Sequence, residues 1–223
     1  MGWFGRSRGP EADGSRSARE AMVRRQIASR GVSHERVLEA MREVPRSHFV
    51  PEGRRREALA DEALPIGHGQ TISQPYIVAS MTAALEPEAG ARVLEVGTGS
   101  GYQAAVLAAC GMEVFSIERI PELREEARRA LERAGYVERV RLRLGDGSKG
   151  WPEEAPFDRI LVTAAAERVP PALVEQLAPG GILVAPIGGR AAQTIVRLRR
   201  TPGGAIERER LERARFVPLV EEA

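Results

Sequence analysis

The segment Val93-Leu94-Glu95-Val96-Gly97-Thr98-Gly99-Ser100-Gly101 (residues 93–101) decides the fold of this chain. Its first four residues form a mostly apolar run that is typical of a buried strand, and a helical pattern begins at Tyr102. The three alternate glycines between them allow the backbone to turn sharply and to approach a ligand closely. The segment therefore predicts a strand, a ligand-binding turn and a helix in succession.

The residues that follow extend the same pattern. From residue 92 onward, short apolar runs alternate with helical segments, which is typical of a parallel sheet with helices on both faces. The expected strands are 92–96, 113–118, 140–144, 159–163 and 182–186, and the expected helices are 102–109, 121–134 and 171–177, the last closed by a turn at 179–181. Two more strands, 194–199 and 213–219, predict an antiparallel pair. The fold class is therefore α/β, with a doubly wound, mostly parallel, Rossmann-like sheet and an antiparallel C-terminal hairpin.

Helices are expected before the sheet. Ser17 and Glu20 have the spacing of a capping box, and the apolar helix face that follows ends at Gly31, a good C-cap. A second amphipathic helix is expected from about Ser33 and ends before Pro45.

The chain is expected to form one compact domain with three parts. Residues 1–16 predict a flexible, Arg-rich leader, residues 17–90 hold the N-terminal helices and a loop, and residues 91–223 form the ligand-binding α/β core. Within the second part, residues 58–74 lack a period and predict a long connection of the kind that often carries function. A helix follows at Pro75, and its free N–H groups point back toward that connection.

The composition excludes several classes of protein. Of the 223 residues, 43% are hydrophobic and 29% are charged, which is the balance of an ordinary soluble domain. Cys110 is the single cysteine, so no internal disulfide forms, and three histidines offer little for a dedicated metal site. No apolar run approaches the roughly 18 residues of a membrane span, and no secretory signal opens the chain. We therefore expect a cytoplasmic protein without a metal.

The charge is uneven along the chain. The formal net charge is +2, yet residues 1–60 hold 13 arginines against 8 acidic residues, an excess of 5. A solvated leader is the simpler explanation of this excess. A phosphate-binding surface for RNA is the alternative.

Acidic residues lie where the expected strands end. Glu118 ends the second strand, 19 residues after Gly99, where a carboxylate can accept hydrogen bonds from both hydroxyls of a ribose. Glu95 lies inside an apolar strand, where a buried charge is costly unless it is paired. A ligand such as S-adenosylmethionine, which carries an ammonium and a sulfonium, would supply that partner. Asp146, before Gly147, follows the third strand and could meet an adenine amino group.

Each of these features also has a simpler explanation. Glycine-rich turns pack helices on strands, Glu95 can pair with a structural arginine such as Arg92, and Asp146 with Gly147 suits a tight turn. The spacing G-x-G-x-G also departs from the dinucleotide fingerprint G-x-G-x-x-G, which weakens a nicotinamide oxidoreductase without excluding it. The joint occurrence of these features at successive strand ends favours a ligand site.

Several stretches match one known family. They are LPIGHGQTISQP at 64–75, the glycine segment at 93–103, GDG at 145–147, APFD at 155–158, VTAAA at 162–166 and RFVPL at 215–219. By these stretches the chain, from about residue 22 to 219, resembles the protein-L-isoaspartate O-methyltransferase family. The glycine segment is typical of class I methyltransferases in general, whereas GQTISQP is far more specific. The leader before Ser17 departs from the family pattern, as does Val220, where some relatives have threonine.

The resemblance implies a set of site residues. Ser73 is then the family's active-site serine, and Thr71, Ile72 and Gln74 beside it approach both the methyl donor and the substrate. The cofactor is held by Glu95, Gly97, Thr98, Gly99, Ser100, Gly101, Glu118, Arg119, Asp146, Gly147 and Thr163.

The resemblance also implies the activity. A methyl group passes from S-adenosylmethionine to the free α-carboxylate of an L-isoaspartyl residue in a damaged protein or peptide, and the ester leads through a succinimide to normal aspartate. Because such a carboxyl has an ordinary pKa of about 3.5, it is ionised at neutral pH and needs no general base. We expect a monomer that acts on isoaspartyl proteins, without nucleic acid or membrane as partner.

Other functions remain open from the sequence. Ser73 could merely cap the helix that begins at Pro75. The chain could be a class I methyltransferase that acts on RNA or a small molecule, a nicotinamide oxidoreductase, or a non-catalytic adaptor with an Arg-rich leader.

Overall fold

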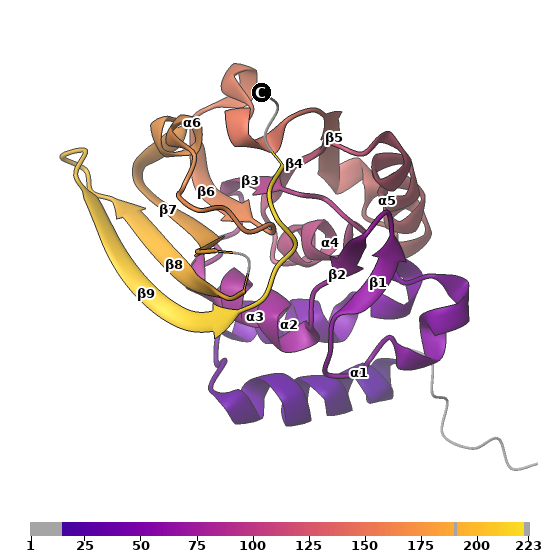
Figure 1. Ribbon diagram of the computed structural model, residues 1–223. Coiled ribbons are helices and arrows are strands. Elements are labelled where there is room, and N and C mark those ends of the chain that lie inside the picture. Colours follow the sequence, from indigo (N-terminus) through magenta and orange to yellow (C-terminus); the bar gives the residue numbers. More distant parts are fainter. Residues whose placement is uncertain (1–14, 190, 221–223) are drawn as a thin grey trace, which may run out of the picture.

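A seven-stranded sheet forms the centre of the molecule (Figure 1). The computed structural model describes residues 15–189 and 191–220, and within them the strand order is β5-β4-β3-β6-β7-β8-β9. The first five strands in this order are parallel, and β8 and β9 are antiparallel to their neighbours. The strand bounds are β3 Arg92–Val96, β4 Glu113–Glu118, β5 Val140–Leu144, β6 Phe157–Val162, β7 Leu177–Ile187, β8 Gln193–Arg200 and β9 Ile206–Ala214.

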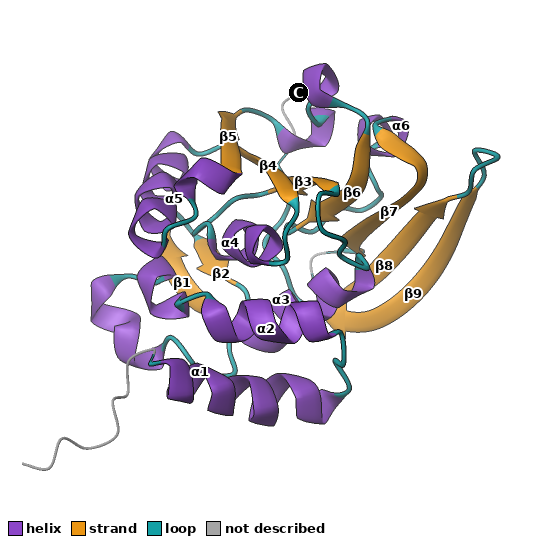
Figure 2. Cartoon of the chain, turned by 180° about the vertical axis from the view of Figure 1, so that it is seen from behind, coloured by secondary structure: helices purple, strands orange, loops and turns teal. Residues whose placement is uncertain are grey.

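Alternate residues of the sheet enter two separate apolar clusters. Val93 of β3 packs with the helices of one face, while its neighbour Leu94 packs with Leu173 on the other. Helices α1 to α5 contribute to the first cluster, and α6 contributes to the second (Figure 2). The N-terminal helices thus share one core with the sheet. The helix bounds are α1 Arg16–Met22, α2 Glu35–Glu43, α3 Pro75–Ala84, α4 Tyr102–Ala109, α5 Pro121–Ala134 and α6 Pro171–Glu175.

The first helix begins earlier than the sequence predicts. Its N-cap is Ser15, whose Oγ accepts a hydrogen bond from the N–H of Ala18 at 3.2 Å, so the expected Ser17–Glu20 capping box is wrong. Glu20 instead pairs with Arg16, one turn away. The helix continues through a π-helical turn, Val23–Ile27, and ends at Gly31 as expected. Residues 1–14 of the expected leader lie outside the described residues, and its last two residues are the N-cap and first residue of α1.

The expected long connection at 58–74 contains a small hairpin. Strands β1 (Leu64–Gly67) and β2 (Gln70–Ile72) pair across a turn in which His68 has a φ of 52°. Strands of four and three residues are too short to show a period of two, which is why the hairpin was not predicted. It holds the residues that follow β2 close to the sheet.

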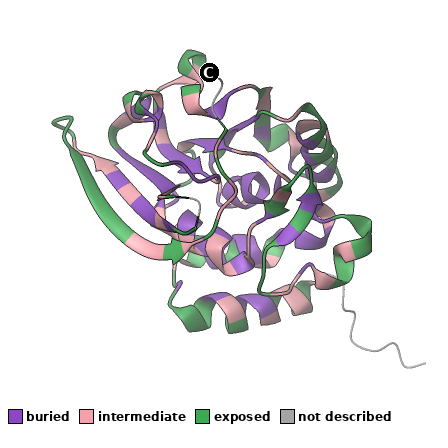
Figure 3. Ribbon diagram, in the orientation of Figure 1, coloured by how far each residue is buried: buried purple, intermediate pink, exposed green. Residues whose placement is uncertain are grey.

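The C-terminal strands differ most from the prediction. Strand β7 begins at Leu177 and runs through the expected turn at 179–181, while α6 ends at Glu175. Strand β9 spans Ile206–Ala214 rather than 213–219. Its alternating glutamates and arginines are exposed at the sheet edge (Figure 3), where charge prevents pairing with another chain and no apolar pattern is needed. Residues 215–219 leave the sheet and cross back toward β6.

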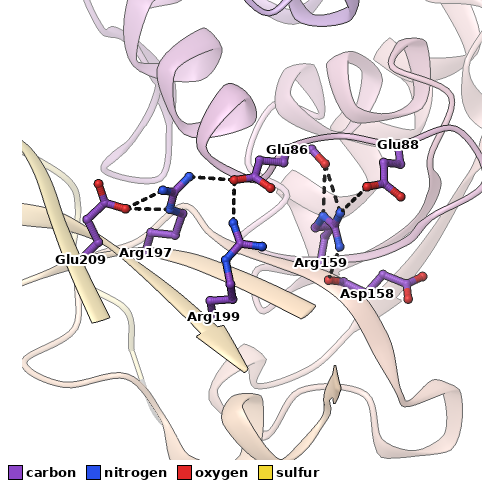
Figure 4. Close-up of polar contacts among 7 residues, drawn as sticks. All are labelled: Glu86, Glu88, Asp158, Arg159, Arg197, Arg199 and Glu209. Atoms are coloured by element: carbon purple, nitrogen blue, oxygen red, sulfur yellow. Dashed lines mark hydrogen bonds and ion pairs between the residues drawn. The ribbon is translucent and has the colours of Figure 1, made fainter. Parts of the chain in front are cut away.

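An ion-pair network ties the connection between α3 and β3 to the antiparallel strands (Figure 4). Glu86 has a φ of 51°, and its carboxylate accepts hydrogen bonds from Arg197 at 3.1 Å and Arg199 at 2.6 Å. Its backbone carbonyl accepts from Arg159 Nε and Nη2 at 3.3 and 3.2 Å. The side chain of Arg159 is 9% exposed and also pairs with Glu88.

We expect the two kinds of arginine in this network to differ in their effect on stability. Arg159→Ala should lower the free energy of unfolding by about 1–3 kcal/mol, because it removes charge-assisted hydrogen bonds in a nearly buried position. Arg199→Ala should cost less than about 1 kcal/mol, because its ion pair is partly solvated. Urea unfolding of both variants measures the difference. Equal losses would contradict this assignment.

Candidate functional site

The carboxyl ends of β3, β4 and β6 meet at one cavity, called the first cavity here. Its walls are residues 70–73 in and just after β2, the glycine turn 96–100, residues 117–120 at the end of β4, and the C-terminal segment 216–220. Gly147, Thr163 and side chains from α3 and α4 also line it, and its empty volume is about 940 Å³ including the open mouth. The sequence predicts this location, because open α/β sheets bind ligands at the carboxyl ends of their strands.

Glycine is required at two positions of the turn. Gly97 has a φ of 96°, and a Cβ there would lie 2.5 Å from Oγ1 of Thr163. The Thr163 hydroxyl donates to the carbonyl oxygens of Val96 at 3.0 Å and Gly97 at 2.6 Å, which joins the ends of β3 and β6. Gly101, outside the cavity wall, has a φ of 85°, and a Cβ there would lie 3.3 Å from side chains of α5. The backbone of the turn therefore forms the cavity wall itself.

Glu118, at the end of β4, lines the first cavity. Its Oε2 accepts a hydrogen bond from the N–H of Gly99 at 2.8 Å, and its Oε1 accepts from the N–H groups of Arg119 and Ile120 at 2.9 and 3.0 Å. A carboxylate has about four acceptor positions, so three bonds leave it able to accept from a ligand hydroxyl. The remaining acceptor capacity of Glu118 fits the hydroxyl donors of a ribose.

Glu95 does not line the cavity. Its side chain is fully buried beneath the turn, where Oε2 accepts from the hydroxyl of Ser116, and Ser116 lies 2.6 Å from the hydroxyl of Thr98. Oε1 has no hydrogen-bond partner. Burial raises the pKa of Glu95 to about 8, with the nearby charge of Glu118 adding to the rise and the Ser116 bond opposing it. The alternative pairing with Arg92 is wrong, since Arg92 pairs with Glu154 and Glu113 instead.

The third strand end contributes backbone rather than a carboxylate. Gly147 lines the first cavity, and a Cβ there would lie 2.4 Å from Val96. Asp146 is outside the wall, and its Oδ1 accepts from the N–H and the hydroxyl of Ser148 at 2.9 and 2.7 Å. The turn explanation for Asp146 therefore holds in the structure.

A second cavity adjoins the first and shares part of its wall. Thr71, Ser73 and Ile77 line both, as do Thr163, Phe216 and Val217. Ile72 faces the first cavity, whereas Gln74 lines only the second and donates to the carbonyl of Asp61 at 2.9 Å.

Ser73 lies where the two cavities meet. The N-cap of α3 is Gln74 rather than Ser73, and no side-chain capping bond is present, so the capping alternative for Ser73 is wrong. The Ser73 hydroxyl makes no hydrogen bond to any of the described residues, and it is therefore available to a ligand.

The C-terminal segment was missing from the predicted site. The N–H of Ala165 donates to the carbonyl of Val217, and the N–H of Leu219 donates to the carbonyl of Ala165, both at 2.7 Å. These bonds hold Phe216 and Val220 against the cavity. The matching stretch RFVPL was the signal that could have placed these residues in the site.

Neither a metal-binding cluster nor a membrane-spanning helix occurs among the described residues. No group of three or more His, Cys, Asp or Glu side chains in residues 15–189 and 191–220 could hold a metal ion. None of the helices in the same ranges has the length and hydropathy that a membrane crossing requires.

The buried carboxyl of Glu95 predicts a pH dependence of stability. Its pKa is raised from 4.5 to about 8 in the folded protein, so the folded state binds the extra proton between these values. Its contribution to stability is therefore present below about pH 4.5 and is lost as the pH rises toward 8. Relative to the parent, Glu95→Gln should gain unfolding free energy steadily over this range, by roughly a few kcal/mol in all.

Urea unfolding of both proteins at a series of pH values measures this slope. The unpaired amide that the substitution introduces adds a cost that is constant with pH, so only the slope counts. A difference between the two proteins that does not change with pH would show that Glu95 is already ionised when folded.

Comparisons with known proteins agree with the geometry. The family model described as protein-L-isoaspartate(D-aspartate) O-methyltransferase (PCMT) matches residues 17–223. A protein-L-isoaspartate O-methyltransferase of Gloeobacter violaceus is 54% identical over 202 residues, which are 90% of this chain and 98% of the relative. One from Opitutus terrae is 55% identical over 204 residues, 92% of this chain and 87% of the relative.

A solved structure has the same fold. A candidate protein-L-isoaspartate O-methyltransferase from Plasmodium falciparum, in complex with S-adenosyl-L-homocysteine, superposes with a TM-score of 0.80 at 25% identity and covers 92% of this chain and 99% of its own. With a family model that spans nearly the whole chain and relatives above 50% identity, the chain belongs to the protein-L-isoaspartate(D-aspartate) O-methyltransferase family.

Proposed function

We propose that the protein transfers a methyl group from S-adenosylmethionine to the free α-carboxylate of L-isoaspartyl residues in damaged proteins and peptides. The observation that carries this proposal is the position of Ser73, whose unpaired hydroxyl lies where the first cavity, at the carboxyl ends of the strands, meets the second cavity. A methyl donor and a methyl acceptor must meet at such a junction.

The first cavity is the cofactor site in this proposal. The cofactor supplies an electrophilic methyl group on a sulfonium. The backbone of residues 97–100, which lines this cavity, would hold the cofactor, and Glu118 would accept hydrogen bonds from its ribose hydroxyls. Arg119, Gly147 and Thr163 also line this cavity, while Glu95, Gly101 and Asp146 lie outside its lining and support the turns from behind.

The second cavity receives the isoaspartyl residue. Ser73 donates a hydrogen bond to one oxygen of the α-carboxylate, which leaves the other oxygen free to attack. The N-terminus of α3, ten residues long, lies next to Ser73, and its free N–H groups and partial positive charge favour an anion there. Ser73 and the start of α3 would thus hold the carboxylate beside the cofactor cavity, in position to attack.

No side chain has to act as a base. The carboxyl has an ordinary pKa of about 3.5 and is ionised at neutral pH. Opposite charges neutralise as the methyl group moves, so exclusion of water favours the transition state over the reactants. Positioning contributes most of the remaining acceleration, up to about 7–11 kcal/mol in favourable models.

The product ester explains a role in repair. The following backbone nitrogen attacks the ester carbonyl, methanol leaves, and a succinimide forms. Water opens the succinimide partly to normal aspartate, which restores the main chain.

We further propose that the enzyme acts as a cytoplasmic monomer, with isoaspartyl proteins and not nucleic acid or membranes as its partners. We also propose that the N-terminal helices, beginning at Ser15 and Arg16, form one compact unit with the α/β core, in view of the core that these helices share with the sheet. The family match disfavours a substrate that is RNA or a small molecule.

A paired set of peptides tests the activity. With labelled methyl donor, we expect transfer to a peptide that contains L-isoaspartate and none to the same peptide with normal aspartate, because the normal side-chain carboxyl places its oxygens at a different distance from the main chain. Equal labelling of both peptides, or of neither, would refute the proposal.

Two substitutions separate the roles of the cavities. Ser73→Ala should lower kcat about tenfold or more while S-adenosylmethionine affinity stays nearly unchanged, because the serine hydroxyl binds only the acceptor. Glu118→Ala should weaken calorimetric affinity for the cofactor by about tenfold or more, as expected for hydrogen bonds to a charged acceptor. A Ser73→Ala enzyme as active as the parent would remove Ser73 from the mechanism.

A further inference from the structure

The second cavity carries more positive charge than its own carboxylates compensate. Three arginines line it, Arg30, Arg213 and Arg215, against one carboxylate, Glu212. Nothing in methyl transfer to a single carboxylate requires more than one of these cations. The excess of positive charge therefore suggests that the second cavity also contacts parts of the substrate other than the isoaspartyl residue.

Two of the four charged groups are already engaged within the protein. Arg30 pairs with Asp61 at 3.3 Å and stacks 3.4 Å from the centre of the Tyr76 ring. Glu212 accepts a hydrogen bond from the hydroxyl of Ser80. These contacts fix both side chains at the edge of the cavity.

The other two cations lack such partners. Arg213 and Arg215 are exposed, and neither forms an ion pair or a side-chain hydrogen bond with any described residue. By contrast, Arg197 and Arg199 on the neighbouring strand β8 both pair with Glu86. Residues 213 and 215 are two apart in an extended stretch, and both line the same cavity as Ser73. A peptide bound at Ser73 would therefore lie close to the positive charges of both arginines.

We propose that Arg213, with Arg215, makes the enzyme select isoaspartyl sites that have other acidic residues close to them in the peptide. This inference rests on the proposed function, because it takes the second cavity as the peptide site. Arg213 is a specificity-determining residue here: it pairs with a flanking Asp or Glu carboxylate, while Ser73 binds the reacting one.

An acidic peptide fits these observations better than a nucleic acid. Glu212 directly precedes Arg213 in the sequence and lines the same cavity, so its charge opposes a continuous phosphate backbone. A peptide can place one or two carboxylates beside the arginines and neutral groups beside Glu212.

The test compares two isoaspartyl peptides that differ only in flanking residues, Glu in one and Gln in the other. For the parent enzyme, we expect the KM for the acidic peptide to be lower than that for the neutral peptide. Each ion pair between an arginine and a flanking glutamate should lower the KM by about two- to fivefold, which corresponds to the free energy of a partly exposed ion pair. Salt should reduce this preference, because the arginines are exposed. In Arg213→Gln the ratio of the two KM values should fall toward one, and the change should appear in KM rather than in kcat.

Arg210→Gln is the matched control. Arg210 lies on the same exposed strand without an ion pair to a described residue, but it does not line the cavity, so the preference should persist when it loses its charge. If both variants lost the preference for the acidic peptide, the preference would come from the overall charge of the protein and not from Arg213, and the inference would be overturned. A parent enzyme with equal KM values for the two peptides would overturn it as well.

Further outcomes are distinguishable. If the parent methylated neither peptide, the proposed function itself would fail. If a short RNA inhibited transfer to the acidic peptide at lower concentration than an unmodified acidic peptide of equal charge, the cavity would prefer phosphate, and the inference would be wrong.

Discussion

The absence of a side chain at Gly97 is the constraint on which the site depends. Because nothing projects from this residue, Thr163 can come close enough to donate to the carbonyls at the end of β3. The turn then leads to Gly99, whose N–H is held by Glu118 from the end of β4. Three strand ends are thus joined through short polar contacts around one glycine. A methyl group at residue 97 would push Thr163 away from the end of β3, and the walls of the cofactor cavity would move apart.

The sequence predicted the parallel part of the sheet well and the edges poorly. Strands β3, β4 and β5 and helices α4 and α5 have the predicted bounds, because buried runs and helical faces there are bounded by glycine, proline or a change of period. Strand β9 was misplaced because an exposed edge needs no apolar residues, and the β1–β2 hairpin is too short to show alternation. The sequence pattern identifies a helix or strand when burial in the core determines which of its residues must be apolar.

The location of the site in the fold can be predicted from the sequence, but most of its side-chain contacts cannot. Residue type and strand end located Glu118, and the family stretch located Ser73, both of which lie in the cavity wall. The sequence does not show on which side of a strand a carboxyl points, so it could not reveal that Ser116 from β4 binds Glu95 behind the turn. Arg213 was assigned to a strand and its place in the second cavity was not predicted.

The C-terminal segment, residues 216–220, completes the wall of the cofactor cavity. Backbone bonds to Ala165 hold this segment there, although the whole seven-stranded sheet precedes it in the chain. Without residues 216–220 the cavity lacks this wall, even when all seven strands are paired. The cofactor cavity is therefore complete only when the last part of the chain has docked against Ala165.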